Sequence, residues 1–76
     1  MRIKVELTFP GELKEEPIIC YLCKTFNIAL NIVEASFSTD TGWAILVFEG
    51  EEDEIAKTLK YLKDKGIDLK NLEKIK

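Results

Sequence analysis

The chain has 76 residues, 46% of them hydrophobic and 33% charged, which predicts one folded domain over residues 1–76 with a core over about 2–70. Its net charge of −3 argues against a nucleic-acid partner, because affinity for the phosphate backbone comes from clustered lysine and arginine. No apolar run is long enough for membrane insertion and no signal peptide is recognisable, so we expect a cytoplasmic protein.

The first elements are a strand and a helix. Residues 2–9 alternate between apolar and polar side chains, as in a strand with one buried face, and Pro10–Gly11 ends it. A helix follows from about Pro17 to Phe26, because proline is tolerated at a helix start and apolar residues recur at helical spacing. The expected apolar stripe is Ile18, Ile19, Leu22, Cys23 and Phe26.

The second strand, about Ile28 to Ser38, contains the most informative residue, Asn31. Asn31 is the one polar residue in the run 28–33, and a buried amide without partners costs about 1–3 kcal/mol. We therefore expect the backbone, water or a ligand to satisfy it. Apolar residues fall at even positions up to Ile32 and at odd positions from Val33 onward. Such a slip predicts a β-bulge and favours display of Asn31 beside a functional site.

The remaining elements are a hairpin, a helix and a fourth strand. Thr39–Gly42 predicts a turn into a third strand, Trp43–Glu49, which is apolar at both odd and even positions and is therefore expected to be central and covered on both faces. The acidic run 51–54 opens a second helix that Gly66 caps, and a fourth strand begins at about Ile67. The expected buried stripe of the second helix is Ile55, Ala56, Leu59 and Leu62.

The order βαββαβ predicts an α+β, ferredoxin-like fold. A four-stranded antiparallel sheet would carry both helices on one face, with the first and third strands central. Apolar side chains of the third strand, Trp43 or Phe48, must then face the uncovered side. That surface suggests a partner subunit and hence a homodimer.

Cys20 and Cys23 form a C-x-x-C pair in the first helix. The sequence has no histidine and no second C-x-x-C, so a tetrahedral zinc site within one chain lacks ligands and we predict no metal site. A dimer could still assemble four thiolates. Free cysteine is among the most buried residue types, so we favour a core or helix-face position over a redox role.

The residues do not predict an enzyme. A catalytic triad cannot be built without histidine, and no phosphate-binding glycine motif is present. The helix dipole explains the acidic run 51–54 better than a metal site does. We therefore expect a non-catalytic chain without a cofactor.

Three aromatic residues, Phe9, Phe37 and Trp43, have two interpretations. Core packing accounts for each one taken singly. Together with the slipped strand they predict an apolar pocket wall near Asn31. For Asn31 alone, the alternative is an edge-strand amide that bonds to solvent or to the bulge backbone.

A series of short motifs resembles the NIL domain, a family named for an Asn-Ile-Leu sequence in its second strand. The resemblance extends from about Arg2 to Leu69, and Val33 conservatively replaces the leucine of the signature. The motifs are Leu7–Phe9, Glu16–Ile19, Phe26–Ile28, Asn31–Val33, Gly42–Trp43 and Gly50–Glu52.

The resemblance implies a ferredoxin-like fold close to that of ACT regulatory domains. Family members are known as the C-terminal domain of methionine-importer ATPase subunits, where they bind methionine at the junction of two domains and hold transport back. Others are fused to iron–sulfur ferredoxin modules in proteins linked to sulfur amino-acid synthesis. By this resemblance Asn31 contacts the ligand, and Ile32 beside it offers backbone groups.

We therefore predict a homodimeric sensor of methionine or a similar amino acid, with a transporter or sulfur-metabolism protein as a further partner. Its predicted ligand-binding residues are Asn31, Ile32, Phe37 and Phe9. An amide donates to a ligand carboxylate and accepts from its ammonium group, while an apolar wall takes a thioether. One alternative is an interaction or scaffold module without ligand binding. Another gives Cys20 and Cys23 a role in sulfur transfer.

Overall fold

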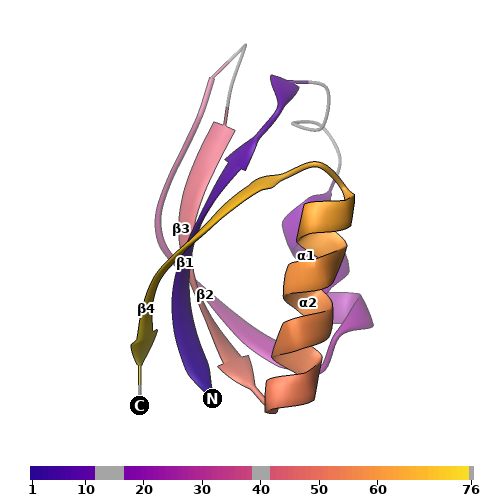
Figure 1. The fold of residues 1–76 in the computed structure, drawn as a ribbon. Helices are drawn as coiled ribbons and strands as arrows, with labels where there is room; N and C mark the ends of the chain where they lie inside the picture. Colours follow the sequence, from indigo (N-terminus) through magenta and orange to yellow (C-terminus); the bar gives the residue numbers. More distant parts are fainter. Residues whose placement is uncertain (12–16, 39–41, 76) are drawn as a thin grey trace.

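The computed structural model describes residues 1–11, 17–38 and 42–75. Its antiparallel sheet has the strand order β2-β3-β1-β4, and both helices pack on one face (Figure 1). This confirms the α+β, ferredoxin-like fold with β1 and β3 in the centre. The elements are β1 (Arg2–Phe9), α1 (Ile18–Thr25), β2 (Ile28–Phe37), β3 (Gly42–Gly50), α2 (Glu52–Asp64) and β4 (Asp68–Ile75).

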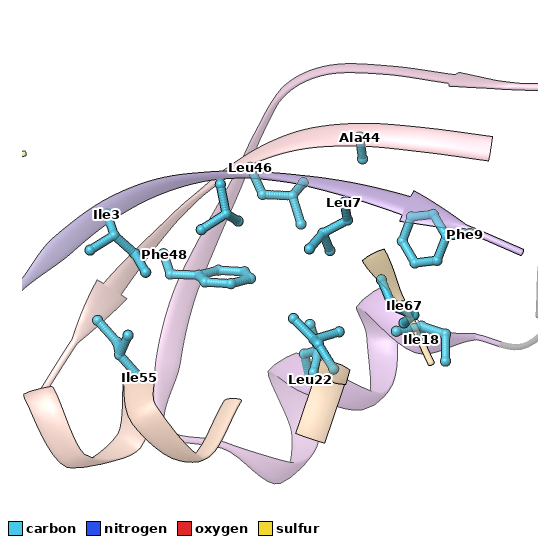
Figure 2. Packing of buried hydrophobic residues seen from close by; sticks show 12 residues of the cluster. Ile3, Leu7, Phe9, Ile18, Leu22, Ala44, Leu46, Phe48, Ile55 and Ile67 are labelled. Carbon is cyan, nitrogen blue, oxygen red and sulfur yellow. The ribbon is translucent and has the colours of Figure 1, made fainter. Parts of the chain in front are cut away.

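The core lies between the sheet and the helix layer. Every second residue of β1 and β3 points toward the helices, because side chains alternate across a strand. Figure 2 shows these side chains meeting Leu22 of α1 and Ile55 of α2, both almost fully buried. Within the described residues the buried hydrophobic set is Ile3, Val5, Leu7, Phe9, Ile18, Leu22, Ala44, Leu46, Phe48, Ile55, Leu62 and Ile67.

Helix α2 buries a polar residue that the sequence pattern did not predict. Thr58 is fully buried, and its hydroxyl donates to the Glu54 carbonyl at 2.9 Å. The predicted Ala56 is exposed instead. The hydrogen bond explains why Thr58 can be buried, because a threonine hydroxyl that is satisfied within its own helix leaves the rest of the side chain free to pack. Gly66 has a φ of 89°, which confirms the predicted glycine cap.

Two contacts join the helices to each other and to β2. The rings of Tyr21 in α1 and Tyr61 in α2 stack with centroids 4.9 Å apart. Where β2 begins, the Asn27 N–H donates to Glu54 Oε1 at 2.9 Å. This bond, followed by that from Lys57, lowers the pKa of Glu54 below its ordinary value of 4.5. The start of β2 is therefore tied to the first turn of α2.

The predicted bulge is present in β2. Ile32 pairs with Leu46 and Glu34 pairs with Ile45, so Val33 is an extra residue between two consecutive partners on β3. Residues 39–41 of the predicted turn lie outside the described part of the chain. Strand β2 forms one edge of the sheet.

The expectation that β3 is covered on both faces holds for one face only. Ala44, Leu46 and Phe48 on the helix side are fully buried. Trp43, Ile45 and Val47 on the open face are only partly buried, because the helices do not reach that face. None of the helices in the described ranges is long and apolar enough to span a membrane.

Candidate functional site

The amide of Asn31 lies on the open face of the sheet, which the helices leave uncovered. Residues paired directly across antiparallel strands share a face. Asn31 pairs with Val47, which in turn pairs with Lys4, whereas Leu30 pairs with the buried Phe48 on the helix side. Asn31 is exposed, as expected if the bulge displays the amide. Because it meets solvent, the cost of burying an amide does not arise.

A hollow of about 120 Å³ lies beside this amide. Glu49 of β3 pairs with Ala29 on one side and with Arg2 on the other, so these three residues form a row next to Asn31 and Val47. All five line the hollow. Arg2 Nε lies 4.0 Å from Glu49 Oε2, and both side chains are about half exposed. A surface pair of this kind contributes little stability and leaves both charges available to a ligand.

The hollow presents the groups that a zwitterionic amino acid needs. Arg2 offers a guanidinium for a carboxylate and Glu49 a carboxylate for an ammonium group, while the Asn31 amide can serve either. Its volume is well below the roughly 300–1,000 Å³ of typical ligand pockets. The hollow of one chain is therefore smaller than a typical ligand pocket. A wider, open hollow of about 470 Å³ adjoins it through Ala29 and Glu49.

Ile32 and the other apolar residues of β2 form a surface along this edge. Ile32 is 51% exposed, and Val33 and Phe37 are each 50% exposed. Ile32 lies on the helix face, opposite Asn31, because consecutive residues of a strand point to opposite faces. Three large, half-exposed apolar side chains on one edge strand are a feature typical of interaction surfaces.

Two of the three predicted aromatic wall residues, Phe9 and Phe37, are brought together, but away from Asn31. Phe9 is buried in the core, and its ring centroid lies 5.7 Å from that of Phe37. Both residues pair with Gly42, which places them on the helix face. The prediction that they wall a pocket beside Asn31 is therefore wrong within one chain. The Phe37 ring covers Gly42 so closely that a side-chain carbon there would collide with it.

A second hollow of about 240 Å³ lies between α2 and β4, and it also has charged residues in its lining. Glu73 pairs with Lys4 of the open face, whereas Lys74 pairs with Ile3 of the core face. The carboxylate and the ammonium group therefore leave the strand on opposite sides. Arg2 and Glu49, by contrast, leave their strands on the same face of the sheet.

Of the two predicted positions for the cysteines, core or helix face, the structure shows the helix face. Cys20 and Cys23 are free thiols on α1, and both are exposed. Cys23 is thus wrongly assigned to the apolar stripe. Among the described residues no group of three or more metal-ligating side chains is found.

Of the residues that line the hollow only Asn31 was predicted, and Arg2, Ala29, Leu30, Val47 and Glu49 were not. The alternation of β1 does place Arg2 on its polar face. The sequence did not reveal which β3 residue lies opposite it, because that depends on strand register. Only the observed pairing brings Arg2, Glu49 and Asn31 to one place.

Comparison with known families supports the resemblance seen in the sequence. Residues 4–71 match the model of the NIL domain, which confirms it. The methionine import ATP-binding protein MetN of Bacillus subtilis (strain 168) is 30% identical over 67 residues, covering 83% of this chain and 20% of that protein. MetN of Halalkalibacterium halodurans is 33% identical over 69 residues, covering 86% of this chain and 20% of that protein. The chain spans about a fifth of these relatives.

Solved structures share the fold. The C-terminal domain of an ABC transporter ATP-binding protein from Enterococcus faecalis superposes with a TM-score of 0.79 at 19% identity, covering 96% of this chain and 86% of that one. The designed protein Foldit4 gives a TM-score of 0.57 at 7% identity, covering 97% of each chain. At these identities the likeness establishes the fold alone.

Proposed function

Since the chain belongs to the NIL domain family, we propose that it is a regulatory domain that binds methionine or a related amino acid where two copies of the chain meet. The observation that carries this proposal is the hollow at Asn31, where an amide, a guanidinium and a carboxylate converge on the open face. The similarity to methionine import proteins supports methionine as the ligand.

Each group in the hollow has a role in this proposal. Arg2 binds the carboxylate of the amino acid, and Glu49 accepts from its ammonium group. Asn31 bonds to either of these ligand groups from the neighbouring strand. Val47 and Ala29 contact the first carbons of the ligand side chain. Apolar residues of a second copy cover the rest of it.

The second copy docks along the edge of β2. This strand is ten residues long, and its middle and end are exposed. Antiparallel pairing of two β2 edges would continue the sheet and bury the half-exposed Ile32 and Val33. The hollow at Asn31 would then gain a second wall. Because ligand and partner contact the same strand, methionine stabilises the dimer by mass action.

The proposal is tested by measuring the thermal unfolding of the protein with a panel of amino acids. A ligand at 100 times its Kd stabilises the native state by about 2.7 kcal/mol, which for a chain of this size raises Tm by about 10–20 °C. Methionine should give this shift. Its methyl ester and its N-acetyl derivative should not, because each lacks one of the two charges that Arg2 and Glu49 bind.

Asn31→Ala supplies the mutational arm of the experiment. Losing a hydrogen bond to a charged ligand group costs about 1.5–3 kcal/mol, so calorimetry should show methionine binding about 10- to 150-fold more weakly. Ser36→Ala is the matched control, since Ser36 is also exposed and pairs with Trp43 on the open face of β2. A protein that responds to no amino acid, or an Asn31→Ala variant that binds methionine normally, contradicts the proposal.

A second candidate function is a docking module that binds a protein without a small ligand. The observation in its favour is the apolar row of Trp43, Ile45 and Val47, which stays partly exposed on the open face of a central strand. A transport protein is the partner suggested by the relatives. If the panel gives no response and Ile45→Glu abolishes complex formation with such a partner, this second function is supported.

A further inference from the structure

Helix α1 carries two thiols on one solvent-facing side, and the proposed function does not use them. Ile18 and Leu22 point into the core, whereas Cys20 and Cys23 are exposed. At 3.6 residues per turn, positions three apart lie about 60° from each other around the helix axis. Both cysteines therefore lie on the side of α1 that faces away from the sheet.

The spacing of the two thiols fits a bridging atom better than a disulfide bond. Side chains three residues apart on a helix have Cβ atoms about 5–6 Å apart. A disulfide needs about 3.5–4.5 Å, so its formation would distort α1. A metal ion with bonds of about 2.3 Å to each sulfur spans sulfurs up to about 4.6 Å apart. The undistorted helix thus suits two thiolates held by one ion.

The donor set also selects the kind of ion. The sequence contains no histidine, and the described part of the chain has no cluster of three metal-ligating side chains. The described residues of one chain therefore do not supply the four ligands that zinc takes. A soft monovalent ion such as Cu(I) prefers thiolates and is stable with two of them. Lys24, one turn from Cys20, places a positive charge on the same side of the helix.

We propose that Cys20 and Cys23 form a surface site that binds one soft monovalent metal ion of the Cu(I) type through both sulfurs. Binding replaces two thiol protons by one metal ion and gives a bis-thiolate complex with a net charge of −1. Two protons are released per ion, so apparent affinity rises with pH. No electron is transferred, and the helix keeps its backbone geometry.

The test is an anaerobic titration of the reduced protein with Cu(I) against the chromophoric chelator bicinchoninate. We expect one ion per chain, with affinity at least tenfold lower in both Cys20→Ser and Cys23→Ser. The matched control is the double variant Cys23→Ser/Thr25→Cys. It keeps two thiols on exposed positions of α1 but places them about 140° apart around the helix. It should lose the site as each single variant does.

Three results would overturn the proposal. The first is that Cu(I) binding does not depend on the paired thiols: either the wild type binds no more Cu(I) than a variant lacking both thiols, or the relocated pair binds Cu(I) as tightly as the wild type does. The second is one ion per two chains, which would mean that thiols of different molecules bridge it. The third is an intact protein 2 Da lighter after mild oxidation with unchanged helical circular dichroism, which would show that a disulfide fits. Circular dichroism of each variant verifies folding, and its methionine response separates this site from the Asn31 hollow.

Discussion

The exposed edge of β2 allows the proposed dimer to be tested through one side chain, Ile32. Ile32 is 51% exposed. Burying such a side chain completely contributes about 1.5–3 kcal/mol, so burying the exposed half contributes about 0.8–1.5 kcal/mol. A two-fold dimer contains Ile32 twice, and Ile32→Ser therefore weakens association by about 1.5–3 kcal/mol. We expect the Kd of the dimer to rise about 10- to 150-fold.

Sedimentation equilibrium over a wide concentration range, with and without methionine, measures this Kd. Tyr21→Ser is the matched control, because Tyr21 is 44% exposed but lies on α1 and stacks on Tyr61 of α2. It removes a similar apolar surface away from β2 and should leave the Kd unchanged. Refutation would come from a wild-type protein that stays monomeric up to millimolar concentration. An effect of Tyr21→Ser equal to that of Ile32→Ser would also refute the β2 interface.

Three further predictions concern stability and can be read from denaturant unfolding. Leu22→Ala should lower the unfolding free energy by about 2–5 kcal/mol, because it opens a cavity under α1 at a fully buried position; a smaller loss would mean that the core closes around it. Gly66→Ala should cost about 1–2 kcal/mol, since φ is 89° there and no neighbour lies within 4 Å of an added carbon; an unchanged midpoint would contradict backbone strain as the cause. The pKa of Glu54 is lowered mainly by the hydrogen bond from the Asn27 N–H and then by that from Lys57. The contribution of ionised Glu54 to the free energy of unfolding is therefore complete above its unfolded pKa near 4.5, and it is lost as pH falls through the lower folded pKa. Glu54→Gln should therefore flatten the acid limb of stability against pH, and an unaltered limb would show that the bond is not formed in solution.

The sequence predicted the fold well, because its elements bury one face each. The alternation of apolar and polar residues predicted both ends of β1, Arg2 and Phe9, correctly. The glycine cap at Gly66 is also confirmed. Errors arose where composition is ambiguous. Cys23 has apolar character but lies on the exposed side of α1, while Thr58 is polar but satisfies its hydroxyl inside its own helix. Hydrophobicity alone does not resolve either case.

The candidate site was predicted only in part. The phase slip identified the bulge and the displayed amide of Asn31, since both follow from the order of residues within one strand. The partners of that amide depend on register between strands, which brings Arg2 and Glu49 beside it. Register is set by the whole sheet, so local patterns in β1 and β3 did not reveal it.

The bulge at Val33 also explains why the aromatic residues and the amide separate. Without the extra residue, strict alternation would place Phe37 on the same face as Asn31. With it, Phe37 returns to the helix face and pairs with Gly42, where its ring contacts Phe9 of the core. The large apolar residues that pair on either side of the slip, Leu30, Ile32 and Phe37, therefore face the helices, while Asn31 keeps the open face. The slip thus completes the core at the end of β2, whereas the hollow at Asn31 is formed before the slip and lies on the open face, where a second copy could cover a shared ligand.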